Sequence, residues 1–286
     1  MVQQLEQVRD IVRKALEEDI GSGDITTLWT VKPSAAAKAV LMAKDPGVIA
    51  GMDIAELAFH LLDEHIHFAK RFQDGHDVEP GVILAEVQGP AQAILSGERT
   101  AINFVQQLSG IATLTARYVR AVRNTKAKIT DTRKTTPGLR VLEKYAVRVG
   151  GGLNHRAGLY DMVLIKENHI LAAGGIAEAA ARVREGLRRD DRPIKVVIET
   201  KDLAEVKEAL DAQPDRIMLD NMPIDRVREA IVLINSVPPD KRPEVEASGR
   251  IALDSVQEIA ETGVDFISVG ALTHSVKALD VSLLFV

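Results

Sequence analysis

The chain has 286 residues, of which 46% are hydrophobic and 27% charged, and its formal net charge is -5. This length allows a sizeable core, while a net acidic chain with 3% aromatic residues lacks the basic face and the stacking platforms of nucleic-acid binders. The absence of cysteine excludes disulfides, thiolate metal sites and cysteine nucleophiles, and it fits a cytoplasmic location.

The first twenty residues predict an amphipathic helix. Leu5, Val8, Val12 and Leu16 recur at three- or four-residue intervals, and a Gly-rich break follows the segment. Charged residues interrupt every apolar run, so we expect neither a signal peptide nor a membrane-spanning segment.

Short β-type runs follow between residues 37 and 95, separated by turn residues and by one helix-like segment at 53–62. Ser96 is a plausible N-cap for a long helix with apolar periodicity. We therefore expect an N-terminal α/β sandwich domain over residues 1–108, to which a strand at about 276–286 returns.

The remaining part, residues 109–275, alternates apolar β-rich runs with helical segments, which predicts α/β architecture with a parallel sheet buried on both faces. The six runs span residues 128–132, 161–167, 194–200, 216–221, 243–249 and 264–270. Every run ends in polar residues, as expected where the strands of a barrel converge on an active site. Because only six strands are clear, we predict an incomplete, irregular α/β barrel.

Four basic residues lie near two of these strand ends, namely Arg133, His155, Arg156 and Lys166. Arginine binds carboxylates with a planar, two-pronged geometry, so the group suits a small polyanion. Scattered surface charge is the alternative. Lys166 also permits a different mechanism, a Schiff base as in aldolases.

Two carboxylates, Glu199 and Asp220, end successive strands after apolar runs. An unpaired carboxylate there would be costly, so each should meet a cation, a hydroxyl or a metal. Ribose and Mg²⁺ are suitable ligands, since Mg²⁺ takes few protein oxygens and shares them with substrate phosphates. Structural salt bridges are the alternative.

Small residues close the last two predicted strands, at Ser248-Gly249 and Gly270-Ala271, and each pair precedes an apparent helix start. Their backbone N–H groups can approach a phosphate closely, although each glycine alone is also a turn signal. The glycines at 150–152 favour a flexible connection over a phosphate loop. Arg99 lies in the first turn of its predicted helix, where the helix dipole disfavours a cation.

At these residues the chain resembles the quinolinate phosphoribosyltransferases, also called carboxylating nicotinate-nucleotide pyrophosphorylases. The likeness covers essentially the whole chain, and its motifs appear in the family's order: EDIGSGDITT, ERTAINFVQQLSGIAT, DTRKTTPGLRVLEKYAVRVGGGLNHRAGLYDMVLIKENH, IET, IMLDNM, EASGRI and FISVGALTHSVKALDVSL. The resemblance implies two domains, assembly at least as a homodimer, composite active sites, and Mg²⁺ as cofactor. It leaves open whether dimers assemble into hexamers.

The resemblance also implies a role for each candidate residue. Arg99 would reach the site from the neighbouring subunit, and Lys134, Glu199 and Asp220 would be catalytic, with the two carboxylates near the ribose and its Mg²⁺. Thr132 would also bind substrate. The other substrate-binding positions are Arg133, His155, Arg156 and Lys166 beside the quinolinate, and Ser248, Gly249, Arg250, Val269, Gly270 and Ala271 at the 5′-phosphate. Arg250 departs from the Asn or Gly expected there.

The implied activity is transfer of phosphoribosyl from phosphoribosyl pyrophosphate to quinolinate, giving nicotinate mononucleotide, pyrophosphate and CO2 in NAD biosynthesis. The alternative is a related pyrophosphorylase that acts on nicotinate or another small anion without decarboxylation. A non-catalytic metabolite-binding regulator is a further alternative, and it would tolerate loss of the carboxylate pair. No nucleic-acid or membrane partner is expected.

Overall fold

The computed structural model describes residues 2–190 and 192–286, which form two compact units. The first comprises Met1–Ala116, Thr135–Gly151 and Ala271–Val286, and the second comprises Arg117–Lys134 and Gly152–Gly270. The chain therefore passes between the units several times, and each is described by itself.

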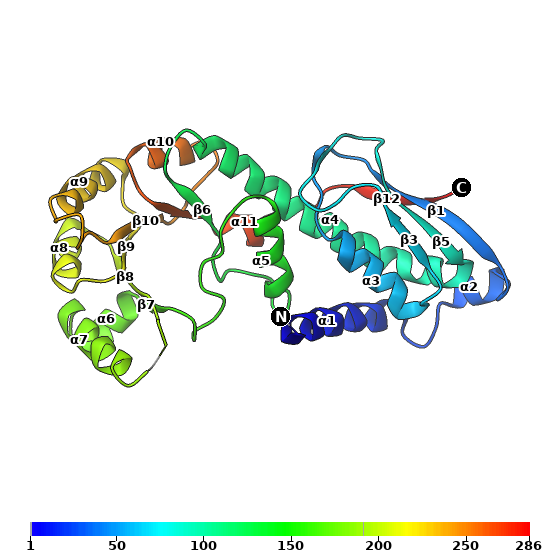
Figure 1. The fold of residues 1–286 in the computed structure, drawn as a ribbon, viewed down its shortest axis with the longest axis horizontal. Coiled ribbons are helices and arrows are strands. Elements are labelled where there is room, and N and C mark those ends of the chain that lie inside the picture. Colours follow the sequence, from blue (N-terminus) through cyan, green and yellow to red (C-terminus); the bar gives the residue numbers. More distant parts are fainter. Residues whose placement is uncertain (1, 191) are drawn as a thin grey trace. The chain divides into compact units, whose positions relative to one another are not determined.

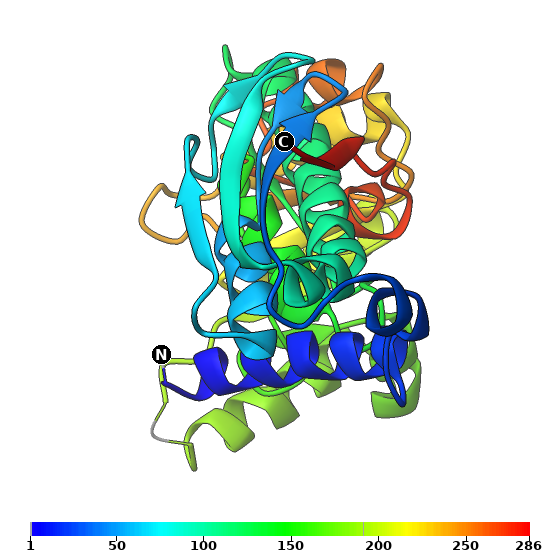
Figure 2. The ribbon, with the colours of Figure 1, turned by 90° about the vertical axis from the view of Figure 1, so that its right-hand side faces the viewer.

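The first unit contains an antiparallel four-stranded sheet in the order β12-β1-β5-β3. Its strands are β1 (Ala36–Ala43), β3 (His67–Lys70), β5 (Ile83–Pro90) and β12 (Val281–Phe285), and a separate pair joins β2 (Gly47–Val48) to β4 (Asp77–Val78). β12 pairs with β1 along its whole length, so the last residues of the chain complete the sheet. β1 and β5 run side by side in Figure 2, and α1 crosses beneath them.

The helices of the first unit are α1 (Val2–Ile20), α2 (Ile25–Thr30), α3 (Met52–Leu62), α4 (Ala91–Val122, shared with the second unit), α5 (Arg140–Val149) and α11 (Ala271–His274). α1 and α3 match the predicted helices. The prediction that Ser96 caps a helix is wrong, because α4 already begins at Ala91. Ser96 lies within it and donates a hydrogen bond to Asp24, the N-cap of α2.

The second unit is built on six parallel strands in the order β6-β11-β10-β9-β8-β7. They are β6 (Lys128–Thr130), β7 (Val163–Ile165), β8 (Val196–Thr200), β9 (Arg216–Asp220), β10 (Glu244–Ser248) and β11 (Phe266–Ser268). Each lies within one of the six predicted runs, so the strand prediction is confirmed. α7 (Ile176–Leu187), α8 (Leu203–Asp211), α9 (Ile224–Asn235) and α10 (Val256–Glu261) lie on the outer side of the strands, with α6 (Glu167–Ala173) following β7 (Figure 1).

The sheet curves but does not close, because β6 and β7 are its two edges. Beside β6 a single parallel bridge joins Thr130 to Leu153, so the segment after α5 only begins a further strand. This arrangement confirms the incomplete, irregular α/β barrel.

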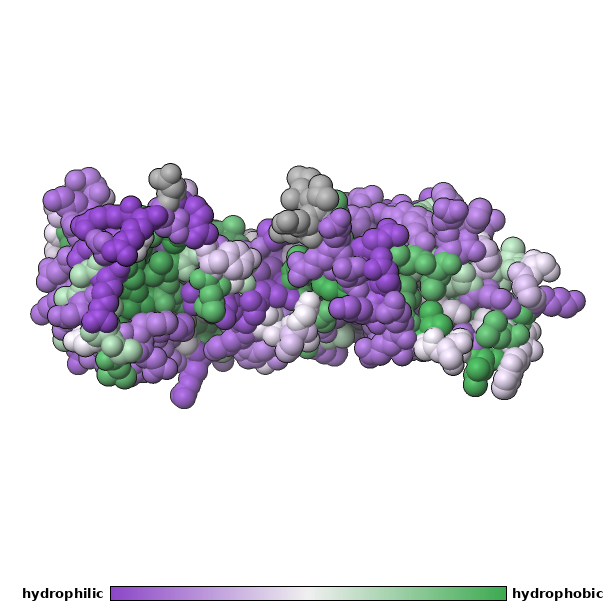
Figure 3. Space-filling model, turned by 90° about the horizontal axis from the view of Figure 1, so that it is seen from below, coloured by the Kyte–Doolittle hydropathy of each residue, from purple (hydrophilic) through white to green (hydrophobic). Residues whose placement is uncertain are grey.

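Polar residues cover most of the face shown in Figure 3. Among the described residues, no helix is both long enough and apolar enough to cross a membrane.

Candidate active site

The strand register places the predicted site residues on one face of the sheet. Ser248 is paired with Asp220, and Glu199 with Met218, two residues before Asp220. Side chains alternate along a strand, and paired residues of neighbouring strands point the same way, so Glu199, Asp220 and Ser248 share a face. The buried cluster of Leu164, Val197 and Met218 lies on this face too, which is therefore the interior of the barrel.

Cations and carboxylates meet at the carboxyl ends of these strands. Lys166, which follows β7, donates a hydrogen bond to Glu199 on β8 at 3.0 Å. Lys166 thus lies beside one of the carboxylates predicted to face the ribose. This ion pair gives Lys166 a partner among the residues predicted for the transferase site, and it provides no support for the Schiff-base alternative.

Arg156 is the most deeply placed of the predicted cations, with 8% of its surface exposed. Its Nη1 donates to the carbonyl oxygen of Met162 at 3.3 Å. Burial, and then the charge of nearby Arg133, lower the pKa of Arg156, while Asp161 acts in the opposite direction. Two guanidinium groups that repel each other near strand ends form a site that an anion would stabilise.

A buried carboxylate at the end of β6 organises the segment that carries these groups. Asp131 accepts hydrogen bonds from the backbone N–H of His155 at 2.8 Å and from the side-chain amide of Asn154 at 2.6 Å. Its own N–H donates to the carbonyl oxygen of Leu153. Asp131 is fully buried, so these bonds stabilise a charge that would otherwise be costly, and they fix the position of Arg156.

The turn after β10 adopts an unusual backbone conformation. Gly249 has φ +97, Arg250 has φ 48 and Asn221, on the neighbouring turn, has φ 53. Asn221 donates its N–H to the carbonyl oxygen of Ser248 at 2.8 Å. A Cβ on Gly249 would lie 2.3 Å from Asn221 Oδ1 and 2.8 Å from its backbone nitrogen, so only glycine fits.

The helix expected directly after this turn is absent, because α10 begins only at Val256. At the other predicted phosphate turn, Val269 and Gly270 end the second unit and Ala271 begins α11, as predicted. The Val269 N–H donates to the carbonyl oxygen of Thr130, which extends the pairing of β11 with β6.

The remaining candidates lie on loops or in the other unit. Lys134 is exposed, and its N–H donates to the hydroxyl of half-buried Thr132 at 3.0 Å. Arg99 is exposed on α4 in the first unit. It does not lie in the first turn of its helix, which begins eight residues earlier at Ala91, so the helix-dipole argument for Arg99 was wrong.

The two carboxylates fit a magnesium ion held mainly by substrate and water. Glu199 and Asp220 point to the same side of adjacent strands. Within residues 2–190 and 192–286, no group of three or more His, Cys, Asp or Glu side chains is arranged to hold a metal. Two carboxylates shared with substrate phosphates match the coordination that Mg²⁺ prefers.

A cavity of about 600 Å³ in the first unit contains none of the predicted substrate residues, and its lining includes Thr100, Thr136 and Glu143. We assign the chemistry to the strand ends, because the converging charges lie there.

Comparison with known proteins agrees with this geometry. Residues 24–109 match the family model of the quinolinate phosphoribosyl transferase N-terminal domain, and residues 111–284 match that of the C-terminal domain. A probable nicotinate-nucleotide pyrophosphorylase [carboxylating] of Bacillus subtilis is 45% identical, with 97% of this chain and 93% of that protein covered. A quinolinate phosphoribosyltransferase [decarboxylating] of Nicotiana glauca is 43% identical, with 96% of this chain and 81% of that protein covered.

Among solved structures, the nicotinate-nucleotide pyrophosphorylase of Francisella tularensis has a TM-score of 0.91 and 39% identity, over 98% of this chain and 96% of that one. Fold, strand-end charges and sequence thus define a phosphoribosyltransferase of the barrel type. The chain belongs to the quinolinate phosphoribosyltransferase family.

Proposed function

We propose that this protein transfers the phosphoribosyl group of phosphoribosyl pyrophosphate to quinolinate and releases pyrophosphate and CO2. The product is nicotinate mononucleotide, a precursor of NAD. The observations that carry the proposal are the ion pair of Lys166 with Glu199 and the closeness of the Arg133 and Arg156 charges, both near the ends of barrel strands. The names of the relatives state the same reaction class.

The three cations Arg133, Arg156 and Lys166 favour quinolinate over a monocarboxylate. Quinolinate carries two carboxylates, and two guanidinium groups with one ammonium supply charge and donors for both. Burial, and then repulsion from Arg133, lower the pKa of Arg156, and binding of the dianion offsets both effects. His155 directly precedes Arg156 in the chain and lines the same pocket.

The carboxylate pair and the two turns hold the other substrate. Glu199 and Asp220 face the ribose, while the backbone N–H groups of Ser248–Arg250 and of Val269–Ala271 bind the 5′-phosphate. Lys134 lies shortly after β6 and contacts the pyrophosphate, and Thr132, two residues before it, also binds substrate. Glu199 and Asp220 would hold Mg²⁺ together with the substrate phosphates, and the ion would supply positive charge against the leaving pyrophosphate.

The reaction needs no protein nucleophile. The pyridine nitrogen forms a bond to the anomeric carbon as the bond to pyrophosphate breaks. Glu199 and Asp220 offset the positive charge that grows on the ribose, and Lys134 stabilises the departing oxygen. The quaternised nitrogen then stabilises the electron pair left when the 2-carboxylate departs as CO2, and a proton from water completes the product.

The active unit is a homodimer in this proposal, with Arg99 contributed by the partner subunit and with hexamers as a further level of assembly. The exposed position of Arg99 on α4 leaves its side chain available for such a contact. The net acidic, cysteine-free composition supports a cytoplasmic location.

A substrate comparison tests the proposal. Purified protein with Mg²⁺ and phosphoribosyl pyrophosphate receives either quinolinate or nicotinate, and the mononucleotide is quantified. Formation of nicotinate mononucleotide from quinolinate alone supports the proposal. Turnover of nicotinate alone transfers the chain to the non-decarboxylating alternative, and no turnover of either compound contradicts the transferase.

A further inference from the structure

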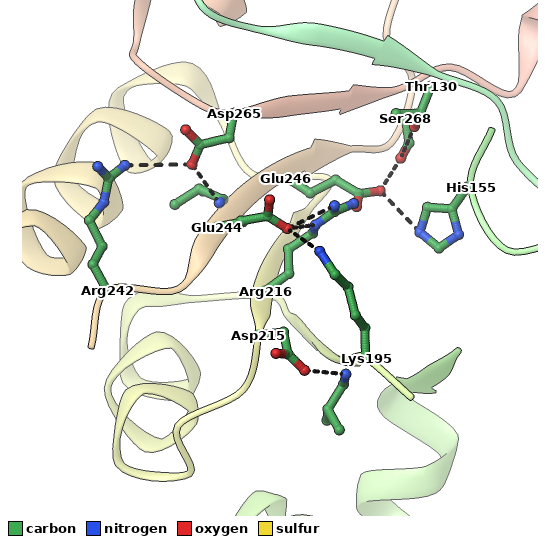
Figure 4. A network of polar contacts seen from close by, with 12 residues as sticks. Thr130, His155, Lys195, Asp215, Arg216, Arg242, Glu244, Glu246, Asp265 and Ser268 are labelled. Atoms are coloured by element: carbon green, nitrogen blue, oxygen red, sulfur yellow. Dashed lines mark hydrogen bonds and ion pairs between the residues drawn. The ribbon is translucent and has the colours of Figure 1, made fainter. Parts of the chain in front are cut away.

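A buried network of polar side chains lies one layer beneath the strand ends that carry the proposed site. Thr130 on β6, Ser268 on β11 and Glu246 on β10 come from consecutive strands, and Arg216 comes from β9 (Figure 4). Glu246 precedes Ser248 by two residues, so both side chains point into the barrel. The network therefore lies directly below the proposed phosphate turn.

Glu246 is the centre of this network and is fully buried. Its Oε2 accepts a hydrogen bond from Arg216 Nη1 at 2.7 Å, and its Oε1 accepts one from Ser268, whose hydroxyl lies 3.2 Å from that of Thr130. Burial alone would raise the pKa of Glu246, but His155, Ser268 and Arg216 outweigh it and hold this pKa below its ordinary value. Glu246 is thus a charged carboxylate inside the barrel.

Glu246 also faces a residue of the proposed quinolinate site. His155 Nε2 lies 3.5 Å from Glu246 Oε1, and the imidazole is almost wholly buried (Figure 4). At this distance the contact is mainly electrostatic. It connects the barrel interior to the segment that carries Arg156.

The hydrogen bond at Nδ1 of His155 determines which ring nitrogen carries the proton. The backbone N–H of Arg156 donates to His155 Nδ1 at 2.8 Å. A backbone N–H can only donate, so Nδ1 carries no proton, and the single ring proton is on Nε2, facing Glu246. His155 therefore presents Nε2–H to Glu246, and its ring is held between Arg156 and Glu246.

Pairing with Arg216 does not distinguish Glu246 from its neighbour Glu244. Arg216 also donates to Glu244 Oε2, at 3.0 Å from Nη2, and its guanidinium lies 3.7 Å from the ring centroid of Phe266. Glu244 is partly exposed and also meets Lys195 at 3.5 Å. The two glutamates share Arg216 as a partner, but of the two it is Glu246 that the structure places against His155.

We propose that Glu246 is a positioning residue for quinolinate binding. It holds His155 as the Nε2–H tautomer, and His155 in turn fixes the backbone of Arg156, so that the guanidinium meets the substrate carboxylate without rearrangement. This role rests on the proposed function and deepens it, because it adds a residue beneath the site to those that touch the substrate.

Steady-state kinetics of Glu246→Gln and its matched control Glu244→Gln test the role. For Glu246→Gln we expect KM for quinolinate to rise about tenfold or more, with KM for phosphoribosyl pyrophosphate and kcat within about threefold of wild type. Glu244→Gln should leave all three within about twofold. Equal effects of the two variants, or an equal rise of both KM values in Glu246→Gln, would overturn the proposal.

A double-mutant cycle separates positioning from general stability. If Glu246 acts through His155, Glu246→Gln combined with His155→Gln should raise KM for quinolinate no further than His155→Gln alone. Multiplicative effects would show that the two residues act independently, and that result would reject the proposed route.

A spectroscopic measurement on the wild-type protein tests the tautomer without turnover. ¹⁵N NMR of the histidine rings should show one imidazole, assigned by its absence in His155→Gln, whose Nδ1 is an unprotonated acceptor and whose Nε2 carries the proton. An Nδ1–H tautomer at His155 would overturn the proposal. Failure of quinolinate turnover in wild type would instead contradict the proposed function, so the two failures are distinguishable.

Discussion

Substitution of Gly249 by alanine is expected to destabilise the protein and to weaken binding of phosphoribosyl pyrophosphate. Gly249 has φ +97, and a Cβ there would meet the side chain and the backbone nitrogen of Asn221. The backbone conformation costs an alanine roughly 1–2 kcal/mol, and relief of the overlap adds roughly 1–3 kcal/mol. We therefore expect a loss of roughly 2–5 kcal/mol in the free energy of unfolding.

Gly174→Ala is the matched control, because Gly174 has φ +96 but no atom within 4 Å of the added Cβ. It should show only the backbone cost, roughly 1–2 kcal/mol, and unchanged kinetics. Urea denaturation gives both stabilities. In Gly249→Ala, KM for phosphoribosyl pyrophosphate should also rise about tenfold, a loss of ~1.4 kcal/mol in binding, with the Kd of quinolinate unchanged. Equal stabilities of the two variants and an unchanged KM would refute the assigned role of this turn.

Four further predictions concern single side chains. Arg133→Ala and Arg156→Ala should each lower kcat/KM for quinolinate about 100-fold, roughly 3 kcal/mol of charge-assisted bonding, with little change in the urea midpoint. Inactive Arg99→Ala mixed with inactive Arg156→Ala should recover part of the activity in hybrid dimers, and no recovery despite subunit exchange would argue against a shared site. Arg250→Asn should raise the free energy of unfolding by up to about 1 kcal/mol, since asparagine tolerates a φ of 48 better than arginine. Because the pKa of Glu246 is lower in the folded state than its value of about 4.5 in the unfolded state, ionised Glu246 stabilises the fold above pH 4.5. This stabilisation is lost as the pH falls through the folded-state pKa. Between pH 5 and 3, the wild type should therefore lose more free energy of unfolding than Glu246→Gln.

The barrel was predictable because its physical signal is local. The strands β8 and β9 are short apolar runs that end in polar groups, and burial on both faces demands that pattern. The start of α4 depended on a signal that the prediction overlooked. Gly89-Pro90 ends β5, and α4 begins at the next residue. The hydroxyl of Ser96 donates a hydrogen bond to Asp24 and does not cap α4.

The supporting residues of the site could not be derived from local pattern. Glu244 and Glu246 alternate with apolar residues in β10, which is typical of a strand with one face in water. Only the register of β9 shows that Arg216 meets them inside the barrel. Asp131 accepts its hydrogen bonds from residues 23 and 24 positions later in the chain, and pairing at that separation is set by the fold.

The central claim is that the cationic strand ends hold quinolinate for transfer and decarboxylation, and the most direct test follows the carbon that leaves. Quinolinate labelled at its 2-carboxylate is incubated with the protein, Mg²⁺ and phosphoribosyl pyrophosphate, and labelled CO2 and nicotinate mononucleotide are measured together. We predict equal amounts of the two products, with no label in the mononucleotide. A mononucleotide that retains the label, or no product while quinolinate still binds, would contradict the account.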